Sequence, residues 1–314
     1  MNKKKFSVIT YNIDGLPEQL DLNDLPWIFK PIVWIYKLIK KTTLITINDG
    51  TDKENSIETI AQRLSKSDFD IIAVQEDFNY HDMLDQYIIP EGYSPSTYTG
   101  GFDLKKIFSS TEWLTKFPLP RFKADGLGLW VKKTTITGEE NEYIKRWKKS
   151  YGYFTHANDA LTHKGYRRYG LMFNKKYPID LYIVHMDADF YHPINCPDVS
   201  KDVKARASQL QQLTKDIIEN SGDAPVIIVG DTNSSSNYTW DVQNITDNLI
   251  NPINSQDNLE ISEAINKTKQ DVDRVFFINN SKASFRIEVD NAYYDDAYNN
   301  LSDHLPFVVE FNII

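Results

Sequence analysis

The chain has 314 residues, of which 41% are hydrophobic and 25% are charged, a composition typical of a globular protein rather than a disordered or fibrous one. Its net charge of −9 provides no overall positive field for nucleic acid, although a bound metal ion can supply positive charge locally. The single cysteine, Cys196, excludes an internal disulfide and a cysteine-based zinc site.

The most apolar stretch, residues 25–47, is almost long enough to span a bilayer, but Pro31 and four lysines interrupt it. Within it, residues 27–41 combine Trp27 and Trp34 with these lysines, which is typical of a cationic amphipathic helix. Two interpretations stay open. The segment is either a helix packed on the core or an insertion that covers a site or contacts a membrane surface.

Short runs rich in valine and isoleucine predict strands that are buried on at least one face. They are residues 6–10, 70–74, 181–184, 226–229, 272–278 and 305–311. Apolar residues at helical spacing predict helices over 56–65 and 201–220. Because strands alternate with helices and no repeat or linker divides the chain, we expect one α/β or α+β layered domain over 1–314, with a loop-rich region at 92–152.

Polar side chains collect where the predicted strands end or begin. They are Asn12, Glu76, His185, Asp231, Asn233, Asp273, Asp303 and His304. Each one alone is most simply a turn residue, a helix cap or a solvated side chain. Their recurrence on most of the strands predicts a common site, because ligands in layered α/β folds bind beyond strand ends.

The donor types predict a hard metal ion at this site. Carboxylate and amide oxygens predominate, which favours Mg²⁺, with Mn²⁺ or Ca²⁺ as alternatives. Asp187 and Asp189 place two further carboxylates after His185, so a second cation is conceivable. Mg²⁺ keeps coordination positions for water and substrate phosphate, and phosphate-ester chemistry is therefore the expected use.

Six short motifs, taken in chain order, resemble those of the endonuclease/exonuclease/phosphatase superfamily. The motifs are Tyr11-Asn12, Gln75-Glu76, His185-Met186-Asp187-Ala188-Asp189, Gly230-Asp231-Thr232-Asn233, Asp273-Arg274-Val275-Phe276 and Ser302-Asp303-His304. Residues 159–165, followed by the histidine motif, are most similar to the neutral sphingomyelinase-type phosphodiesterases. The resemblance implies a four-layer α/β/β/α sandwich of two packed mixed sheets, the DNase-I-like architecture, with the site at one edge.

The resemblance also implies which residues hold the metal ion and the attacking water. Glu76 would be the main metal ligand, and Asn12 and Asp303 would lie close to the metal ion or position its waters. Asp231 and Asn233 would orient the attacking water and the scissile phosphate.

Further roles concern proton transfer and substrate binding. His304, held by Asp273, would be the general base or an imidazolium that faces the phosphate, and His185 would be the general acid or a phosphoryl stabiliser. Lys164 and Arg167, in and after the sphingomyelinase-like segment, are candidates for binding the phosphate or an anionic head group.

The expected function is that of an Mg²⁺-dependent phosphoric ester hydrolase, a sphingomyelinase-like phosphodiesterase that cleaves a phospholipid head group by in-line attack of water. Residues 27–41 would contact the membrane. A nuclease or a phosphomonoesterase is the alternative, and a non-catalytic binding module on the same fold is the second. The first residues lack the apolar region of a signal peptide, which favours the cytoplasm, whereas this activity would suit a secreted protein.

Overall fold

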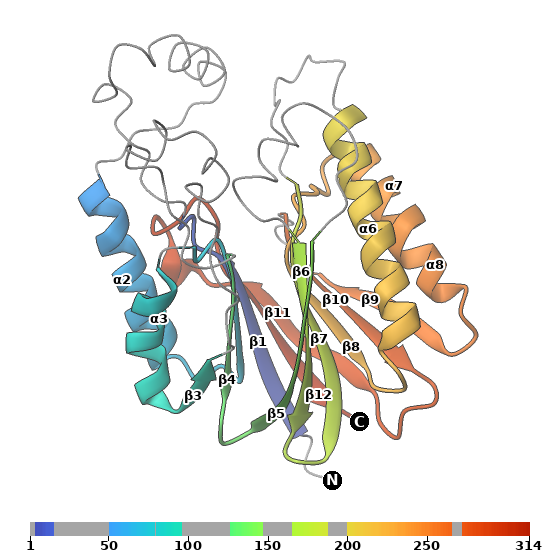
Figure 1. Cartoon of the computed structure of the whole chain (residues 1–314), viewed down its shortest axis with the longest axis horizontal. Coiled ribbons are helices and arrows are strands. Elements are labelled where there is room, and N and C mark those ends of the chain that lie inside the picture. Colours follow the sequence, from blue (N-terminus) through green and yellow to red (C-terminus); the bar gives the residue numbers. More distant parts are fainter. Residues whose placement is uncertain are drawn as a thin grey trace, which may run out of the picture.

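Two β-sheets pack face to face, and helices cover the outer face of each, in the computed structural model of the chain (Figure 1). The structure describes residues 4–15, 50–78, 80–95, 126–146, 165–187, 200–265 and 272–314. The architecture is the four-layer α/β/β/α sandwich that the motifs imply.

The first sheet has the strand order β11-β12-β1-β2-β4-β3. Its strands are β1 (Lys4–Asn12), β2 (Ile71–Gln75), β3 (Tyr93–Pro95), β4 (Leu127–Lys132), β11 (Ile287–Tyr294) and β12 (Phe307–Ile313). The central strands β1 and β2 run parallel, and β12 and β4 flank them in the antiparallel direction. The starts of β4 and β12 therefore lie at the same end of the sheet as the last residues of β1 and β2.

The second sheet repeats this pattern with the order β5-β6-β7-β8-β10-β9. Its strands are β5 (Ile136–Arg146), β6 (Gly165–Phe173), β7 (Tyr177–His185), β8 (Val226–Asp231), β9 (Leu259–Ala264) and β10 (Asp273–Asn280). The strands β7 and β8 are parallel, and β6 and β10 flank them in the antiparallel direction. The start of β10 thus lies beside the end of β8.

The helices form the outer layers. They are α2 (Gly50–Lys66), α3 (His81–Ile88), α6 (Ser200–Asn220), α7 (Thr239–Ile245) and α8 (Asn251–Asn254), with the short turns η2 (Ile89–Glu91), η4 (Thr246–Ile250) and η5 (Asp296–Tyr298). Helix α2 buries Ile57, Ile60, Ala61 and Leu64 at helical spacing against β1 and β2. Helix α6 packs on β7 and β8 through Leu210, Leu213 and Ile217.

Alternation along the strands decides which side chains face the gap between the sheets. Phe6 and Val8 of β1 share one buried cluster with side chains of the second sheet, whereas Ile9 and Tyr11 belong to the cluster under the helices. Asn12 continues the inward-facing set. By the same period of two, His185 and Asp231 follow inward-facing residues of β7 and β8, and Asp273, the first residue of β10, precedes the inward-facing Val275.

All six predicted strands and both predicted helices are confirmed, with ends that differ by a few residues. The stretch 92–152, which we expected to be rich in loops, contributes β3, β4 and β5 where the structure describes it. The apolar-cationic segment 25–47 lies outside the described residues. No helix in the described ranges is long and apolar enough to cross a membrane.

Candidate active site

The site lies at one end of both sheets, where the parallel strands finish and their antiparallel neighbours begin. Asn12 Nδ2 donates hydrogen bonds to Asp231 Oδ2 at 3.0 Å and to Glu76 Oε1 at 3.3 Å, so one amide joins the first sheet to the second. Asn12 Oδ1 accepts the backbone N–H of Asp14 at 3.0 Å. The strand ends thus bring together residues that are up to 219 positions apart in the sequence.

Glu76 directly follows β2 in a left-handed backbone conformation, with φ of 62°. Its N–H donates to the carbonyl oxygen of Gly126 at 2.7 Å, which holds the bend in place. A non-glycine residue in this region is strained, and such residues cluster at functional sites because the surrounding structure must hold them. The bend ends the strand and places the Glu76 carboxylate beside Asn12.

His185 ends β7 and lies between two carboxylates. Its Nε2 is 3.4 Å from Glu76 Oε1 and 3.7 Å from Asp231 Oδ2, and its side chain is buried. A close approach of β7 to β8 makes this possible, because Gly230 has φ of 137° and a Cβ there would lie 2.0 Å from the carbonyl oxygen of Val184. The glycine therefore allows the histidine and Asp231 to meet.

Asn233 follows Asp231 in a tight turn. Its N–H donates to Asp231 Oδ1 at 2.8 Å, its φ is 49°, and its Nδ2 donates to the carbonyl oxygen of Met186 at 2.9 Å. The Met186 N–H in turn donates to the carbonyl oxygen of Asp231 at 2.9 Å. These bonds fix the loop after β8 against the loop after β7.

His304 and Asp273 form a close pair at the same end. The distance from His304 Nδ1 to Asp273 Oδ2 is 2.6 Å. Burial opposes the charged imidazole, but the Asp273 carboxylate, assisted by Asp231 and Asp303, holds the pKa of His304 well above its ordinary value. Because Nδ1 faces Asp273, Nε2 is the ring atom that can act on a substrate.

Asp303 lies at the edge of the site rather than inside it. Its side chain is 71% exposed, and its Oδ1 is 3.9 Å from His304 Nε2. The preceding Ser302 Oγ donates to the carbonyl oxygen of Asn12 at 2.8 Å, which ties this loop to β1. The predicted catalytic residues and metal ligands therefore converge, with Asp303 on the rim.

A family model described as the endonuclease/exonuclease/phosphatase family matches residues 9–304. The chain belongs to this family. A search of curated protein sequences finds no match.

Solved structures of the family share the fold at low sequence identity. D. rerio TDP2 in complex with a single-strand DNA product is 16% identical, with a TM-score of 0.55 over 98% of this chain and 99% of that one. The catalytic domain of human Nocturnin with a bound sulfate anion is 14% identical, with a TM-score of 0.59 over 99% and 98%. ANGEL2, described as a 2',3'-cyclic phosphatase, is 14% identical, with a TM-score of 0.58 over 99% and 96%.

Phosphoesterases of this family generally use a divalent metal ion, and the donors present fit one. Within the described ranges, no three Asp, Glu, His or Cys side chains form a complete metal-binding group. Mg²⁺ does not require such a group, because it commonly takes one or two carboxylates and completes its coordination with water and substrate phosphate. Glu76 supplies a carboxylate of this kind, and the Asn12 amide lies beside it, with Nδ2 toward Glu76 and the oxygen accepting the Asp14 N–H.

The structure describes only one of the two predicted substrate-binding residues. Lys164 lies outside the described residues. Arg167 lies on β6, on the face between the sheets, and is fully buried with Nη1 donating to Tyr169 Oη at 3.0 Å. Its register partner Ile183 is two residues before His185, so its charge lies beneath the site.

The sequence analysis missed a cation at the edge of the site. Lys53, in α2, lies 3.1 Å from Asp14 Oδ1. Asp14 is two residues beyond Asn12 and has φ of 49°. The predicted helix begins at residue 56, whereas α2 begins at Gly50 and so includes Lys53.

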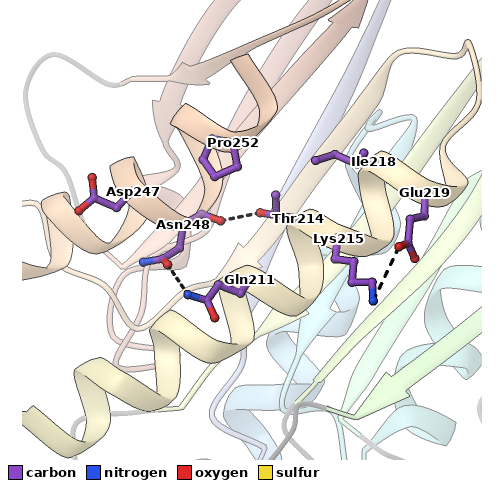
Figure 2. A pocket seen from close by; sticks show the side chains of 8 residues that line it. All are labelled: Gln211, Thr214, Lys215, Ile218, Glu219, Asp247, Asn248 and Pro252. Carbon is purple, nitrogen blue, oxygen red and sulfur yellow. Dashed lines mark hydrogen bonds and ion pairs between the residues drawn. The ribbon is translucent and has the colours of Figure 1, made fainter. Parts of the chain in front are cut away.

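A pocket of about 350 Å³ lies elsewhere, on the outer helical layer (Figure 2). The second half of α6, η4 and α8 line it. Gln211 Nε2 donates to Asn248 Oδ1 at 2.8 Å, and Thr214 Oγ1 donates to the Asn248 carbonyl oxygen at 2.7 Å. The polar groups of these side chains are therefore paired with one another. The pocket lies at the second half of α6, so it is not part of the site at the strand ends.

Proposed function

We propose that this chain is a metal-dependent phosphoesterase that hydrolyses its substrate by in-line attack of water. The observation that carries the proposal is the convergence of Glu76, Asp231 and His185 with the His304–Asp273 pair at one end of both sheets. Carboxylates alone would repel an anionic phosphate, and a cation held at Glu76 removes that repulsion.

Each group would have a separate task. When bound, the metal ion polarises the phosphoryl group and neutralises its charge. Asp231 and Asn233 hold the attacking water in line with the phosphorus atom. His304 Nε2 accepts the proton of that water or, as an imidazolium, faces the phosphate, while Asp273 fixes the ring through Nδ1.

His185 completes the cycle. Its Nε2, which lies between Glu76 and Asp231, would donate a proton to the leaving oxygen or stabilise the phosphoryl charge. Asp303 on the rim would position water of the metal ion. Arg167 would act on the substrate only through its charge, because its guanidinium is buried.

Within this class we propose a phospholipid as the substrate, with a sphingomyelinase-like cleavage of the head group. Three features of the sequence support this choice: the aromatic and cationic segment 27–41, the sphingomyelinase-like segment 159–165 that ends beside the cationic Lys164, and the acidic net charge, which weighs against nucleic acid.

The test is hydrolysis of sphingomyelin in mixed micelles, plasmid DNA, a nucleotide and a sugar phosphate, each with Mg²⁺ and with a chelator. We expect turnover of sphingomyelin that the chelator abolishes and that Glu76→Gln and His304→Ala each reduce by about 10²-fold or more. Turnover of DNA or of a soluble ester instead would keep the reaction and replace the substrate. Absence of turnover with all four substrates would overturn the proposal in favour of a binding module.

A further inference from the structure

A buried arginine connects the two loops that carry His185 and Asn233. Arg206, in the second turn of α6, is fully buried. Its Nη1 donates to the carbonyl oxygen of Asp187 at 3.2 Å, and its Nη2 donates to Asp241 Oδ1 at 2.8 Å. One guanidinium thus contacts both the loop after β7 and the start of α7.

The loop after β7 is held from α6 at a second point. Gln209, one helical turn after Arg206, accepts the N–H of Asp187 at Oε1 (3.0 Å), and its Nε2 donates to Asp187 Oδ2. The carboxylate of Asp187, a predicted candidate for binding a second cation, is buried in this contact. Asp187 is two residues after His185, so these bonds fix where β7 ends.

The loop after β8 is held through Asp241. While Oδ1 of Asp241 accepts from Arg206, its Oδ2 accepts the N–H of Ser235 at 3.1 Å. Ser235 is two residues after Asn233, whose amide already bonds to Met186 in the facing loop. A continuous set of hydrogen bonds therefore runs from one catalytic loop through α6 to the other.

The chemistry of the contact suggests a purpose beyond packing. A buried ion pair is costly to desolvate, and apolar side chains of similar volume often stabilise a fold equally well. A planar guanidinium, unlike an ammonium, can hold two acceptors in fixed directions at once. Misplacement of a catalytic group by about 1 Å can reduce a rate by about 10²-fold.

We infer that Arg206 is a positioning residue, which holds His185 and Asn233 in their catalytic arrangement through Asp187 and Asp241. The inference rests on the proposed function for its effect on turnover. Its effect on the loops can be measured without a substrate.

The test compares Arg206→Lys with Arg168→Lys. Arg168, in β6, also contacts two acceptors, near the other end of α6: its Nη2 donates to Asp180 Oδ2 at 2.6 Å and to the carbonyl oxygen of Asn220, and its side chain is 23% exposed. Both variants lose a two-acceptor contact and keep the charge. We expect Arg206→Lys to lower kcat about tenfold or more, with KM for the hydrolysed substrate within about threefold, and Arg168→Lys to leave both unchanged.

Hydrogen exchange gives the readout that does not depend on turnover. In Arg206→Lys, the amides of Asp187 and Ser235 should exchange faster than in the wild type, whereas amides of β2 should not change. If both loops exchange as in the wild type, Arg206 does not hold them and the inference is wrong. If they exchange faster but kcat stays within twofold of the wild type, the contact is structural and the inference is equally wrong.

A double variant separates positioning from stability. Arg206→Met with Asp241→Leu removes both charges, so it should restore much of the stability that a single substitution loses, but not kcat. Recovery of kcat together with stability would overturn the inference. If the wild type hydrolyses none of the four substrates, the proposed function fails, and hydrogen exchange alone still decides whether Arg206 holds the loops.

Discussion

Among the described residues, two histidines face an aspartate through Nδ1, in different layers of the molecule. His304 Nδ1 lies 2.6 Å from Asp273 Oδ2 at the strand ends, and His81 Nδ1 lies 2.5 Å from Asp77 Oδ2 at the start of α3. In each pair the carboxylate outweighs the effect of burial, and the pKa of the imidazole lies above its ordinary value. Contact and charge alone do not distinguish the two pairs.

Their surroundings do distinguish them. The His304 side chain is 16% exposed and opens toward the site, whereas the His81 side chain is 2% exposed and stacks on Trp130 with 5.1 Å between ring centroids. Trp130 in turn donates from Nε1 to Asp85 Oδ1 at 2.7 Å. An Asp–His pair can therefore serve in proton transfer only where the fold gives it access to a substrate.

The largest expected difference is in turnover. His304→Gln should lower kcat by about 10²-fold or more, because Nε2 no longer exchanges a proton with water or phosphate. His81→Gln should change kcat by less than about threefold, since its ring lies in the helical layer. Steady-state kinetics on whichever substrate the wild type hydrolyses measure both. A large and equal loss in the two variants would show that position does not separate the pairs.

Stability should show the opposite order. His81→Gln should lower the free energy of unfolding by roughly 1–3 kcal/mol, because the buried Asp77 carboxylate loses its cationic partner. His304→Gln should cost less, since its ring is partly exposed and water can replace it. Urea denaturation of the two variants beside the wild type measures this. If His304→Gln were the less stable variant, the assignment of roles would be reversed.

Crowding the His81–Asp77 pair should have a similar effect without replacing either residue. A Cβ at Gly128 would lie 2.5 Å from Asp77 Oδ2 and 2.6 Å from the Trp130 ring. We therefore expect Gly128→Ala to lower the free energy of unfolding by roughly 1–3 kcal/mol. Gly170→Ala is the matched control in a strand, because the nearest atom to its Cβ would be 3.9 Å away. Equal stability of the two variants in thermal denaturation would contradict the tight packing around Asp77.

The smallest expected effect is the pH dependence of the stability that the His81–Asp77 pair contributes. Because the pKa of His81 is raised in the folded protein, its stabilising contribution is complete below the unfolded pKa of about 6.5 and is lost as pH rises through the folded pKa. The difference in unfolding free energy between wild type and His81→Gln should therefore be largest in mildly acidic solution and shrink toward alkaline pH. A difference that grows with pH would mean that His81 is neutral when folded.

Much of this arrangement follows from local sequence. The central strands are almost entirely apolar, so β2 and β8 were predictable. Within each sheet the last residues of the central pair lie at one end, because β1 runs parallel to β2 and β7 runs parallel to β8. Strands such as β6 and β11 carry no apolar run of this kind. β6 places Arg167 and Arg168 in mid-strand, and β11 alternates polar and apolar residues at the edge of a sheet.

Parts of the site network could not be predicted because their partners are distant in sequence. Helical spacing places Arg206 on the same buried face as Leu210 and Leu213, but its acceptors are 19 and 35 positions away, and nothing in the helix indicates that they lie in two loops. The Asp77–His81 spacing of four residues could have been noticed, since it is the spacing of neighbours on a helix. Its burial under Trp130, which decides its role, is a property of the folded chain only.

The site depends on Gly230, although this residue has no side chain. A side chain there would collide with the Val184 carbonyl oxygen and push β8 away from β7, separating His185 from Asp231. In a library of random substitutions this position would tolerate as little change as Glu76. Low tolerance to substitution would therefore not distinguish a catalytic residue from Gly230, which contributes only the space in which His185 and Asp231 meet.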